Sequence, residues 1–501
     1  MFRRILIANR GEIAVRIIRA CRELDIQTVV VYSEADANSL AVQLADQAVL
    51  IGSAAPSESY LRAERIIEAA RRTDCQAIHP AFGFLSENAA FAQMVRDAGL
   101  TFIGPTPEAI RAMGLKTEAL ARVRAFGVPT LPSYDGQGLQ ADFQRAADQL
   151  GYPLLVKAAA GGGGKGMRVV RTAAELPEAL EAAAREAGKA FADNRLFLER
   201  FIETARHIEV QILADQHGNM VHLFERECSI QRRHQKIIEE SPSPYLEKRP
   251  ELRAAMCAAA LRAAQSVNYT NAGTVEFIVD AETGEFFFLE MNTRLQVEHP
   301  VTEAVTDVDL VQMQIRIAAG EPLPFSQADL YQRGHAIECR IYAEDPADNF
   351  LPATGELLCV LPPSAPNIRV DSGVRTGDSI SIHYDPMIAK LIAHARTRPE
   401  AIRRLDAALA AYVILGVTTN IAFLRDVLAH PDFVNGETTT RLIERAFADW
   451  RPPSAALPEA ALIAAALSLL LQSDAPSASA SSAESDPFSP WARPDSFRIG
   501  A

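Results

Sequence analysis

Two glutamates lie where a carboxylate is costly, inside stretches of otherwise apolar residues. Glu276 lies within one β-rich segment, Glu290 ends another, and residues 282–284 between them predict a hairpin turn. A carboxylate among apolar residues is unfavourable unless it is paired or bound to a cation. Together with the amide oxygen of Asn292, the two carboxylates would suit Mg²⁺ carried by phosphates. On the hairpin alone, structural ion pairs are an equal alternative.

A run of glycines lies between two β-rich segments. Residues 154–157 form the first segment, residues 161–164 are all glycine, and residues 167–170 form the second segment. Glycine lets backbone N–H groups approach phosphate oxygens closely, and Lys157 could reach an anionic oxygen. No helix is predicted after the glycines and GxxxxGK[ST] does not match, so neither a Rossmann loop nor a P-loop is supported. The glycines alone would favour a flexible hairpin, but together with the acidic hairpin they favour phosphate and metal binding.

Arg294, Gln296 and Glu298 follow the acidic hairpin at alternate positions. In an extended segment these side chains share one face, so a cation, an amide and a carboxylate would lie beside the metal. Such a face could bind a small anion and remove its proton, with Glu298 as general base. The three residues alone would favour a solvated strand edge. The polar segment 228–236 and Lys116, each taken alone, also favour a solvated surface.

Helices and strands alternate in the first part of the chain. Apolar residues recur at helical spacing in residues 12–24, between β-rich segments. The predicted strands of this part are residues 4–8, 27–32, 77–79 and 100–103. This order predicts a parallel sheet with helices on both faces.

The whole chain is predicted to combine α/β and α+β units, in four regions. The predicted regions are an N-terminal α/β domain (1–114), a smaller glycine-loop domain (115–202), a mixed domain (203–450), and a helix with a flexible linker (451–501). Composition changes sharply after residue 450, where an Ala/Leu-rich stretch precedes a Ser/Ala-rich stretch at 473–485.

Composition limits the classes of function. The formal charge of −13 argues against nonspecific nucleic-acid binding, which requires cations to replace counterions. Six cysteines without a CxxC pair favour reduced thiols. The apolar runs at 5–8 and 460–471 are too short for a signal peptide or a membrane span. These features predict a cytoplasmic protein that binds neither nucleic acid nor membrane.

Several motifs together resemble the biotin carboxylases of the ATP-grasp superfamily, in the family's order and over roughly residues 1–450. The matching stretches are Ile7–Ala14, His79–Asn88, the glycine loop, Gln231–Lys236, Glu290–Pro300, Gly334–Arg340 and Tyr384–Lys390. The order of many motifs is more specific than any single one of them. The resemblance implies an ATP-grasp fold, with nucleotide held between the glycine loop and the acidic hairpin.

The resemblance also implies roles for individual residues. Phosphate contacts would come from Lys116, Lys157, Gly163 and Gly164. The adenine and ribose would lie at Glu199, Arg200, Phe201, Ile202 and His207, with Gln231 and His234 nearby. Glu276, Glu290 and Asn292 would hold Mg²⁺ or Mn²⁺. Bicarbonate would bind Lys236, Arg294, Gln296 and Val297, Glu298 would deprotonate it, and Arg340 would stabilise the biotin enolate.

The implied reaction has two stages and needs partners. Bicarbonate attacks ATP to give carboxyphosphate and ADP, and biotin then captures the carbon dioxide released. Biotin would be presented by a carrier protein or domain, because the accepting Ala-Met-Lys-Met motif does not occur in these 501 residues. A carboxyltransferase subunit and a homodimer or larger hetero-oligomer are also implied.

The tail is weakly similar to α subunits of acyl-CoA carboxylases, including the methylcrotonyl- and geranyl-CoA types. Two alternatives stay open at the level of sequence. One is another ATP-grasp carboxylate ligase, and the other is a nucleotide-binding regulatory subunit whose catalysis has decayed.

Overall fold

The computed structural model describes residues 1–135, 140–158, 167–191, 193–452 and 459–473. The chain forms two compact units, Met1–Arg451 and Pro452–Ala501. In the second unit, the predicted Ala/Leu-rich helix is present as α17 (Glu459–Ser473). The predicted linker lies outside the described residues from residue 474 onwards. Within the described part of the chain, no helix is both long and apolar enough to cross a bilayer.

The first unit begins with the predicted parallel sheet. Its strands, in the order β3-β2-β1-β4-β5, all run parallel. Their bounds are β1 Arg4–Ile7, β2 Gln27–Ser33, β3 Gln47–Gly52, β4 Ala77–His79 and β5 Thr101–Phe102. The accompanying helices are α1 Gly11–Glu23, α2 Leu40–Leu44, α3 Ala63–Arg72, α4 Ala89–Asp97 and α5 Pro107–Gly114. Strands β1, β2 and β4 are nearly continuous buried runs, as expected for the centre of a sheet covered on both faces, whereas the edge strand β3 is partly exposed.

A small antiparallel sheet follows helix α6 (Lys116–Ala125). Its strand order is β6-β9-β7-β8, with β6 Ser133–Asp135, β7 Leu154–Ala158, β8 Arg168–Val170 and β9 Leu196–Arg200. Helices α7 (Gln140–Leu150) and α8 (Leu176–Phe191) belong to the same part of the chain. Strands β7 and β8 pair antiparallel, which confirms the strands predicted on either side of the glycines. The glycine loop itself lies outside the described residues.

The largest sheet has eight antiparallel strands in the order β14-β13-β10-β11-β12-β15-β22-β20. The bounds are β10 Ala205–Ala214, β11 Met220–Arg232, β12 Gln235–Ser241, β13 Asn271–Asp280, β14 Phe286–Asn292, β15 His335–Tyr342, β20 Ile368–Ser372 and β22 Met387–Ala395. Strands β13 and β14 form the predicted hairpin.

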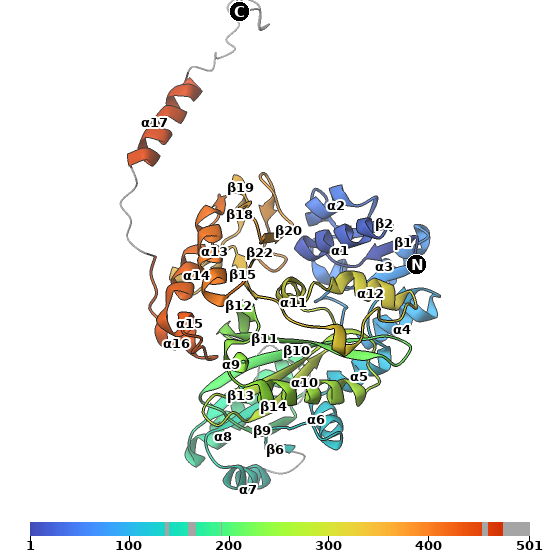
Figure 1. The fold of residues 1–501 in the computed structure, drawn as a ribbon, viewed down its shortest axis with the longest axis vertical. Coiled ribbons are helices and arrows are strands. Elements are labelled where there is room, and N and C mark those ends of the chain that lie inside the picture. Colours follow the sequence, from blue (N-terminus) through green and yellow to red (C-terminus); the bar gives the residue numbers. More distant parts are fainter. Residues whose placement is uncertain (136–139, 159–166, 192, 453–458, 474–501) are drawn as a thin grey trace, which may run out of the picture. The chain divides into compact units, whose positions relative to one another are not determined.

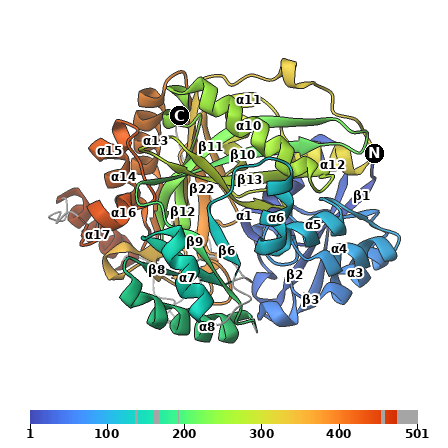
Figure 2. The ribbon, with the colours of Figure 1, turned by 90° about the horizontal axis from the view of Figure 1, so that it is seen from below.

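Helices cover this sheet at both ends. Helix α10 (Pro250–Gln265) packs against β10, β11 and β13, and Figure 2 shows these elements side by side. Helix α11 (His299–Thr306) lies against β11, β12, β15 and β22. Helix α13 (Arg398–Ala411) packs on β15 and β22 near the end of the unit (Figure 1).

The remaining elements are short and lie mostly in the C-terminal part of the first unit. The helices are α9 Pro244–Glu247, α12 Leu310–Ala318, α14 Ile421–Ala429, α15 Pro431–Val434 and α16 Leu442–Ala446. The strands are β16 Glu344–Asp345, β17 Leu351–Pro352, β18 Gly355–Glu356, β19 Cys359–Leu361, β21 Ser379–Ile380 and β23 Val413–Leu415.

The backbone after β20 lies very close to the backbone at the start of α1. Helix α1 packs against β20, and a Cβ on Gly373 would lie 2.3 Å from the carbonyl carbon of Gly11 and 2.4 Å from the nitrogen of Glu12. Only glycine fits at this distance, because both nearest atoms belong to the backbone. Gly373 therefore lets the turn that begins α1 lie directly against the segment after β20.

We expect Gly373→Ala to destabilise the protein by about 1–3 kcal/mol, because the added methyl group forces the two backbones apart. The free energy of unfolding in urea measures the effect. Gly114→Ala is the matched control, since its Cβ would enter open space at the end of helix α5. Equal stability of the two variants would contradict the steric argument.

Candidate active site

A cavity of about 630 Å³ lies between the parallel sheet and the large antiparallel sheet. It is lined by many of the residues singled out in the sequence: His207, His234, Lys236, Glu276, Glu290, Asn292, Arg294, Gln296, Val297 and Arg340. Its other walls come from the N-terminal turn at residues 9–13, from residues 82–84 and from residues 383–387. The fold thus brings together segments that are far apart in the sequence.

The acidic hairpin provides oxygen ligands on one wall of this cavity. Glu276 on β13 and Glu290 on β14 are directly paired across the two strands. The Nδ2 group of Asn292 donates to Glu276 Oε1 at 2.8 Å. Lys116 Nζ lies 3.7 Å from Glu290 Oε2, so this predicted phosphate-binding lysine reaches the same wall. Carboxylate oxygens converging from paired strands fit a Mg²⁺ ion, which prefers hard oxygen ligands.

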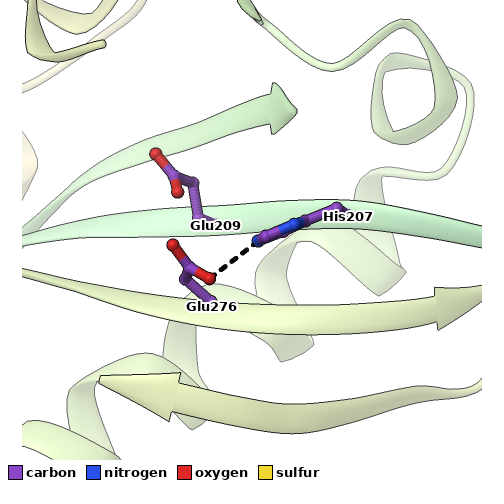
Figure 3. Close-up of side chains that lie close together, drawn as sticks. All are labelled: His207, Glu209 and Glu276. Carbon is purple, nitrogen blue, oxygen red and sulfur yellow. Dashed lines mark ion pairs between the residues drawn. The ribbon is translucent and has the colours of Figure 1, made fainter. Parts of the chain in front are cut away.

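Strand β10 adds a histidine and a third glutamate, shown in Figure 3. His207 Nε2 lies 2.9 Å from Glu276 Oε2, and ligand atoms of His207, Glu209 and Glu276 all lie within 4.8 Å of one another. The Nε2 group of Gln231 is 2.6 Å from His207 Nδ1. Gln231 is therefore connected to the cavity through His207.

Lys236 on β12 is the cation at the centre of these carboxylates. Its Nζ donates to Glu209 Oε2 at 2.5 Å, to Glu276 Oε1 at 2.8 Å and to Glu298 Oε1 at 2.6 Å. Burial opposes the charge of Lys236, but the three carboxylates outweigh it and raise its pKa well above the ordinary value. Lys236 is therefore protonated at neutral pH and remains an anion-binding group.

Glu298 is fully buried and lies between two cations. Its Oε1 accepts from Lys236, and its Oε2 accepts from Arg340 at 2.9 Å. Arg340 on β15 also donates through Nε to Glu239 Oε1 at 2.6 Å. Burial raises the pKa of Glu298, but Lys236 and Arg340 outweigh this and hold that pKa well below its usual range. Glu298 is thus ionised at neutral pH, the state in which it can accept a proton.

The guanidinium group of Arg294 is fixed by three side-chain acceptors and by the carbonyl oxygen of Leu295 at 3.3 Å. Its Nε donates to Glu87 Oε2 at 2.9 Å, its Nη1 to Gln296 Oε1 at 2.8 Å and its Nη2 to Asn292 Oδ1 at 3.1 Å. Gln296 and Asn292 are close to Arg294 in the sequence, whereas Glu87 lies in the N-terminal part of the chain. The cation is therefore held beside the acidic hairpin by groups from two distant parts of the chain.

The predicted extended face of Arg294, Gln296 and Glu298 is wrong in its geometry. Residues 297 and 298 form a turn, and Glu298 is the N-cap of α11. The physical reason is Pro300, which occupies the first turn of that helix, where a missing N–H costs nothing. Arg294 and Gln296 still line the cavity, and Glu298 adjoins it from behind Lys236 and Arg340.

The residues predicted to contact the nucleotide do not all line the same cavity. Lys157 on β7 forms an ion pair with the buried Glu199 on β9. Arg200, Phe201 and Ile202 line a second cavity of about 420 Å³ beside the β13–β14 turn. Gly163 and Gly164 lie outside the described residues, so the structure gives no placement for them.

Several residues of the site were missed by the sequence reasoning. Glu209 alternates with His207 and Gln211 along β10, and its two neighbours in that strand, Ile208 and Val210, are apolar; a carboxylate between apolar residues is the same signal that identified Glu276. Lys390 is fully buried on β22, where its Nζ donates to the carbonyl oxygen of Val297 at 2.9 Å. Lys390 is the only charged residue among the apolar residues that precede His394 in this strand. A cation in such a position is unfavourable without a partner, so the sequence could have indicated that Lys390 is paired.

Models of three protein families match successive parts of the chain. "Biotin carboxylase, N-terminal domain" matches residues 1–110, "Carbamoyl-phosphate synthase L chain, ATP binding domain" residues 116–326, and "Biotin carboxylase C-terminal domain" residues 338–445.

Similar proteins include biotin carboxylases and longer carboxylase subunits. The chain is 50% identical over 447 residues to biotin carboxylase 1 of Bacillus subtilis, covering 89% of this chain and 98% of the relative. It is 48% identical over 491 residues to the mitochondrial methylcrotonoyl-CoA carboxylase subunit alpha of Rattus norvegicus, covering 97% of this chain and 68% of the relative.

A solved structure gives the same result for the fold. The biotin carboxylase domain of the Hydrogenobacter thermophilus 2-oxoglutarate carboxylase, a dimer in complex with MgADP, ADP and bicarbonate, is 46% identical, with a TM-score of 0.86. The match covers 89% of this chain and 98% of that domain. Family models, relatives and fold agree along the first unit, and the chain therefore belongs to the biotin carboxylase family and has its ATP-grasp fold.

Proposed function

We propose that this chain is an ATP-dependent ligase that carboxylates biotin, on a carrier protein, with bicarbonate as the source of carbon. The observation that carries the proposal is the ionised Glu298, held between Lys236 and Arg340 beside the acidic hairpin. This arrangement combines a base, anion-binding cations and a set of metal ligands in one cavity. Its support also includes the H. thermophilus domain, whose structure contains MgADP and bicarbonate.

Nucleotide phosphates would lie along the acidic hairpin. Glu276 and Glu290, with Asn292, would hold Mg²⁺ or Mn²⁺, which supplies positive charge to the phosphate oxygens during phosphoryl transfer. Lys116 would add a phosphate contact from its position beside Glu290. We propose residues 115–202 as the domain that covers the nucleotide, between an N-terminal domain (1–114) and a C-terminal region (203–450).

Bicarbonate would bind among Lys236, Arg294 and Gln296. Glu298 would accept the proton of bicarbonate, and the bicarbonate oxygen would attack the γ-phosphorus of ATP. The products of this step are carboxyphosphate and ADP. Most of the catalysis would come from positioning and electrostatic stabilisation, as in other phosphoryl transfers.

Biotin would then be carboxylated at the same site. Carboxyphosphate would break down to carbon dioxide and phosphate, and the phosphate would take the proton of the biotin ureido nitrogen. Arg340 would stabilise the enolate oxygen of biotin by charge and hydrogen bonding. The ureido nitrogen would then attack carbon dioxide to give carboxybiotin.

The proposed partners are a biotinylated carrier and a carboxyltransferase that accepts the carboxyl group. A methylcrotonyl-CoA type of final acceptor has the support of the rat relative, which aligns over 97% of this chain, whereas the Sus scrofa propionyl-CoA carboxylase alpha chain aligns over 89%. The Arabidopsis thaliana methylcrotonoyl-CoA carboxylase subunit alpha aligns over 90%, so the propionyl-CoA type differs little in coverage. A geranyl-CoA type is the other acceptor proposed from the tail. A cytoplasmic location and a homodimer stay predictions.

The direct test is ADP release from MgATP, measured with and without bicarbonate and with and without free biotin. We expect release that requires bicarbonate and is stimulated by biotin, because biotin consumes the carboxyphosphate product. Stimulation by another carboxylic acid and indifference to biotin would indicate a different ATP-grasp ligase. ATP binding without any hydrolysis would indicate a regulatory subunit.

Glu298→Gln should lower the bicarbonate-dependent rate of ADP release by at least about 100-fold, because a general base contributes roughly 10²–10⁴-fold. ATP binding should survive, since Glu298 pairs with Lys236 and Arg340, whereas the proposed phosphate-binding lysines Lys116 and Lys157 pair with Glu290 and Glu199. Glu356→Gln, an exposed control with the same change of charge, should keep the full rate. An unchanged rate in Glu298→Gln would remove the proposed base.

Arg340→Ala should slow formation of carboxybiotin more than it slows bicarbonate-dependent ADP release without biotin. The reason is that the enolate charge appears only in the second stage. Both rates are measured on the same preparation, with retained ATP binding as evidence of folding. Equal losses in the two rates would count against a role of Arg340 at the enolate.

A further inference from the structure

The turn at residues 296–298 is held from behind by two buried side chains. It connects β14 to α11, and its first two carbonyl groups, those of Gln296 and Val297, accept hydrogen bonds from buried side chains. His299 Nδ1 lies 2.7 Å from the carbonyl oxygen of Gln296, and Lys390 Nζ lies 2.9 Å from that of Val297. Both His299 and Lys390 are fully buried. Neither side chain has a part in the chemistry proposed above.

The hydrogen bond of His299 fixes the state of its ring. A carbonyl oxygen can only accept, so Nδ1 must carry the proton. Burial lowers the pKa of His299 well below its ordinary value, with Lys390 contributing in the same direction, so the ring is neutral. Its Nε2 then carries a lone pair, and it has no hydrogen-bond partner among the residues that the structure describes.

Lys390 brings a charge to the second carbonyl. Its Nζ also lies 3.2 Å from Glu12 Oε2 and 3.9 Å from Asp371 Oδ2. These carboxylates come from α1 and β20, so Lys390 joins the N-terminal domain and the end of the large sheet to the turn. Because moving a buried ammonium group away from two carboxylates and a carbonyl would leave its charge unpaired, the side chain of Lys390 is fixed in this position.

The directions of the two carbonyls determine those of the N–H groups. In a planar trans peptide, the N–H points opposite to the C=O of the same unit. The only cis peptides in the described residues precede Pro153 and Pro242, so both peptides of this turn are trans. The N–H groups of Val297 and Glu298 therefore point away from His299 and Lys390. None of the described residues accepts a hydrogen bond from either N–H.

The N–H of Val297 belongs to a residue of the cavity wall, and the N–H of Glu298 lies at the N-terminal end of α11. Val297 lines the cavity beside Arg294 and Gln296, and Glu298 begins helix α11, whose N-terminal end carries partial positive charge. A donor at the carbonyl polarises the peptide, so that its N–H becomes a stronger donor.

We infer that His299 and Lys390 are positioning residues that orient and polarise the 296–298 turn for bicarbonate, without touching the anion themselves. The inference rests on the proposed function. It predicts that the two residues affect the affinity for bicarbonate, and that they affect neither ATP binding nor the stability of the protein. The opposing explanation is that both residues only hold α11 against the sheet, as α11 packs on β12, β15 and β22.

The test compares His299→Leu with His299→Asn. Leucine removes the side-chain donor and leaves only the longer bond from the backbone nitrogen of residue 299, at 3.4 Å. The Nδ2 group of asparagine, in contrast, can take the place of Nδ1 and donate to the Gln296 carbonyl. We expect His299→Leu to raise KM for bicarbonate about tenfold, equivalent to about 1.4 kcal/mol, with KM for ATP changed less than about twofold. His299→Asn should restore most of the bicarbonate affinity. All values come from bicarbonate-dependent ADP release by the purified chain.

A second variant removes the positive charge of Lys390 together with one negative charge, so the net charge of the buried cluster does not change. Lys390→Met combined with Glu12→Gln replaces the buried cation and one of its carboxylates by neutral groups of similar size. We expect the same selective rise in KM for bicarbonate. This pair keeps the inference testable if His299→Leu does not fold.

The outcomes separate the inference from the function on which it rests. Absence of bicarbonate-dependent ADP release in the unchanged chain would overturn the proposed function itself. With that activity present, an unchanged KM for bicarbonate in His299→Leu, or equal rises in both KM values, would overturn the inference. Failure of His299→Asn to recover affinity in a folded protein would also count against it, because the donor would then not be the feature that matters.

Discussion

The structure of the site depends on one interaction, the contact of Lys236 with three buried carboxylates. Each ion taken out of water costs several kcal/mol, so Glu209, Glu276 and Glu298 can remain charged only while a cation lies among them. The four groups come from β10, β12, β13 and the start of α11. Arg340 on β15 is the second cation at Glu298, so the ionised state of the proposed base is a consequence of how four strands and a helix are assembled.

The same interaction demands a particular strand register. In a sheet, a slip of one residue moves every side chain to the other face. At β13 such a slip would replace Glu276 at the cavity by Phe277, which belongs to the core beneath α10. At β12 it would replace Lys236 by Ile237, another core residue. Apolar packing on one face and ion pairing on the other thus favour the same register.

The sequence predicted those parts of the site whose signals are local. Glu276 was identifiable because a carboxylate in an apolar strand needs a partner, and the hairpin placed Glu290 opposite it. Lys390 gave a similar signal, but its partners Glu12 and Val297 are separated from it by long stretches of chain. Pairing at such distances depends on the fold as a whole. The turn at Glu298 was missed because alternation was weighed without Pro300, which favours the start of a helix.

Carboxylates with no role in the proposed chemistry hold two of the cations of the cavity in position. Arg294 is held by Glu87, and Arg340 is held by Glu239, in the absence of any substrate. A charged side chain fixed in this way needs no reorganisation when an anion arrives, and this preorganisation is the main source of electrostatic catalysis. Loss of Glu87 would leave Arg294 held only by Gln296, Asn292 and the Leu295 carbonyl, and loss of Glu239 would leave Arg340 held mainly by Glu298. The geometry of the proposed active site is therefore maintained partly by residues with no role in the proposed chemistry, and it is formed when the protein folds.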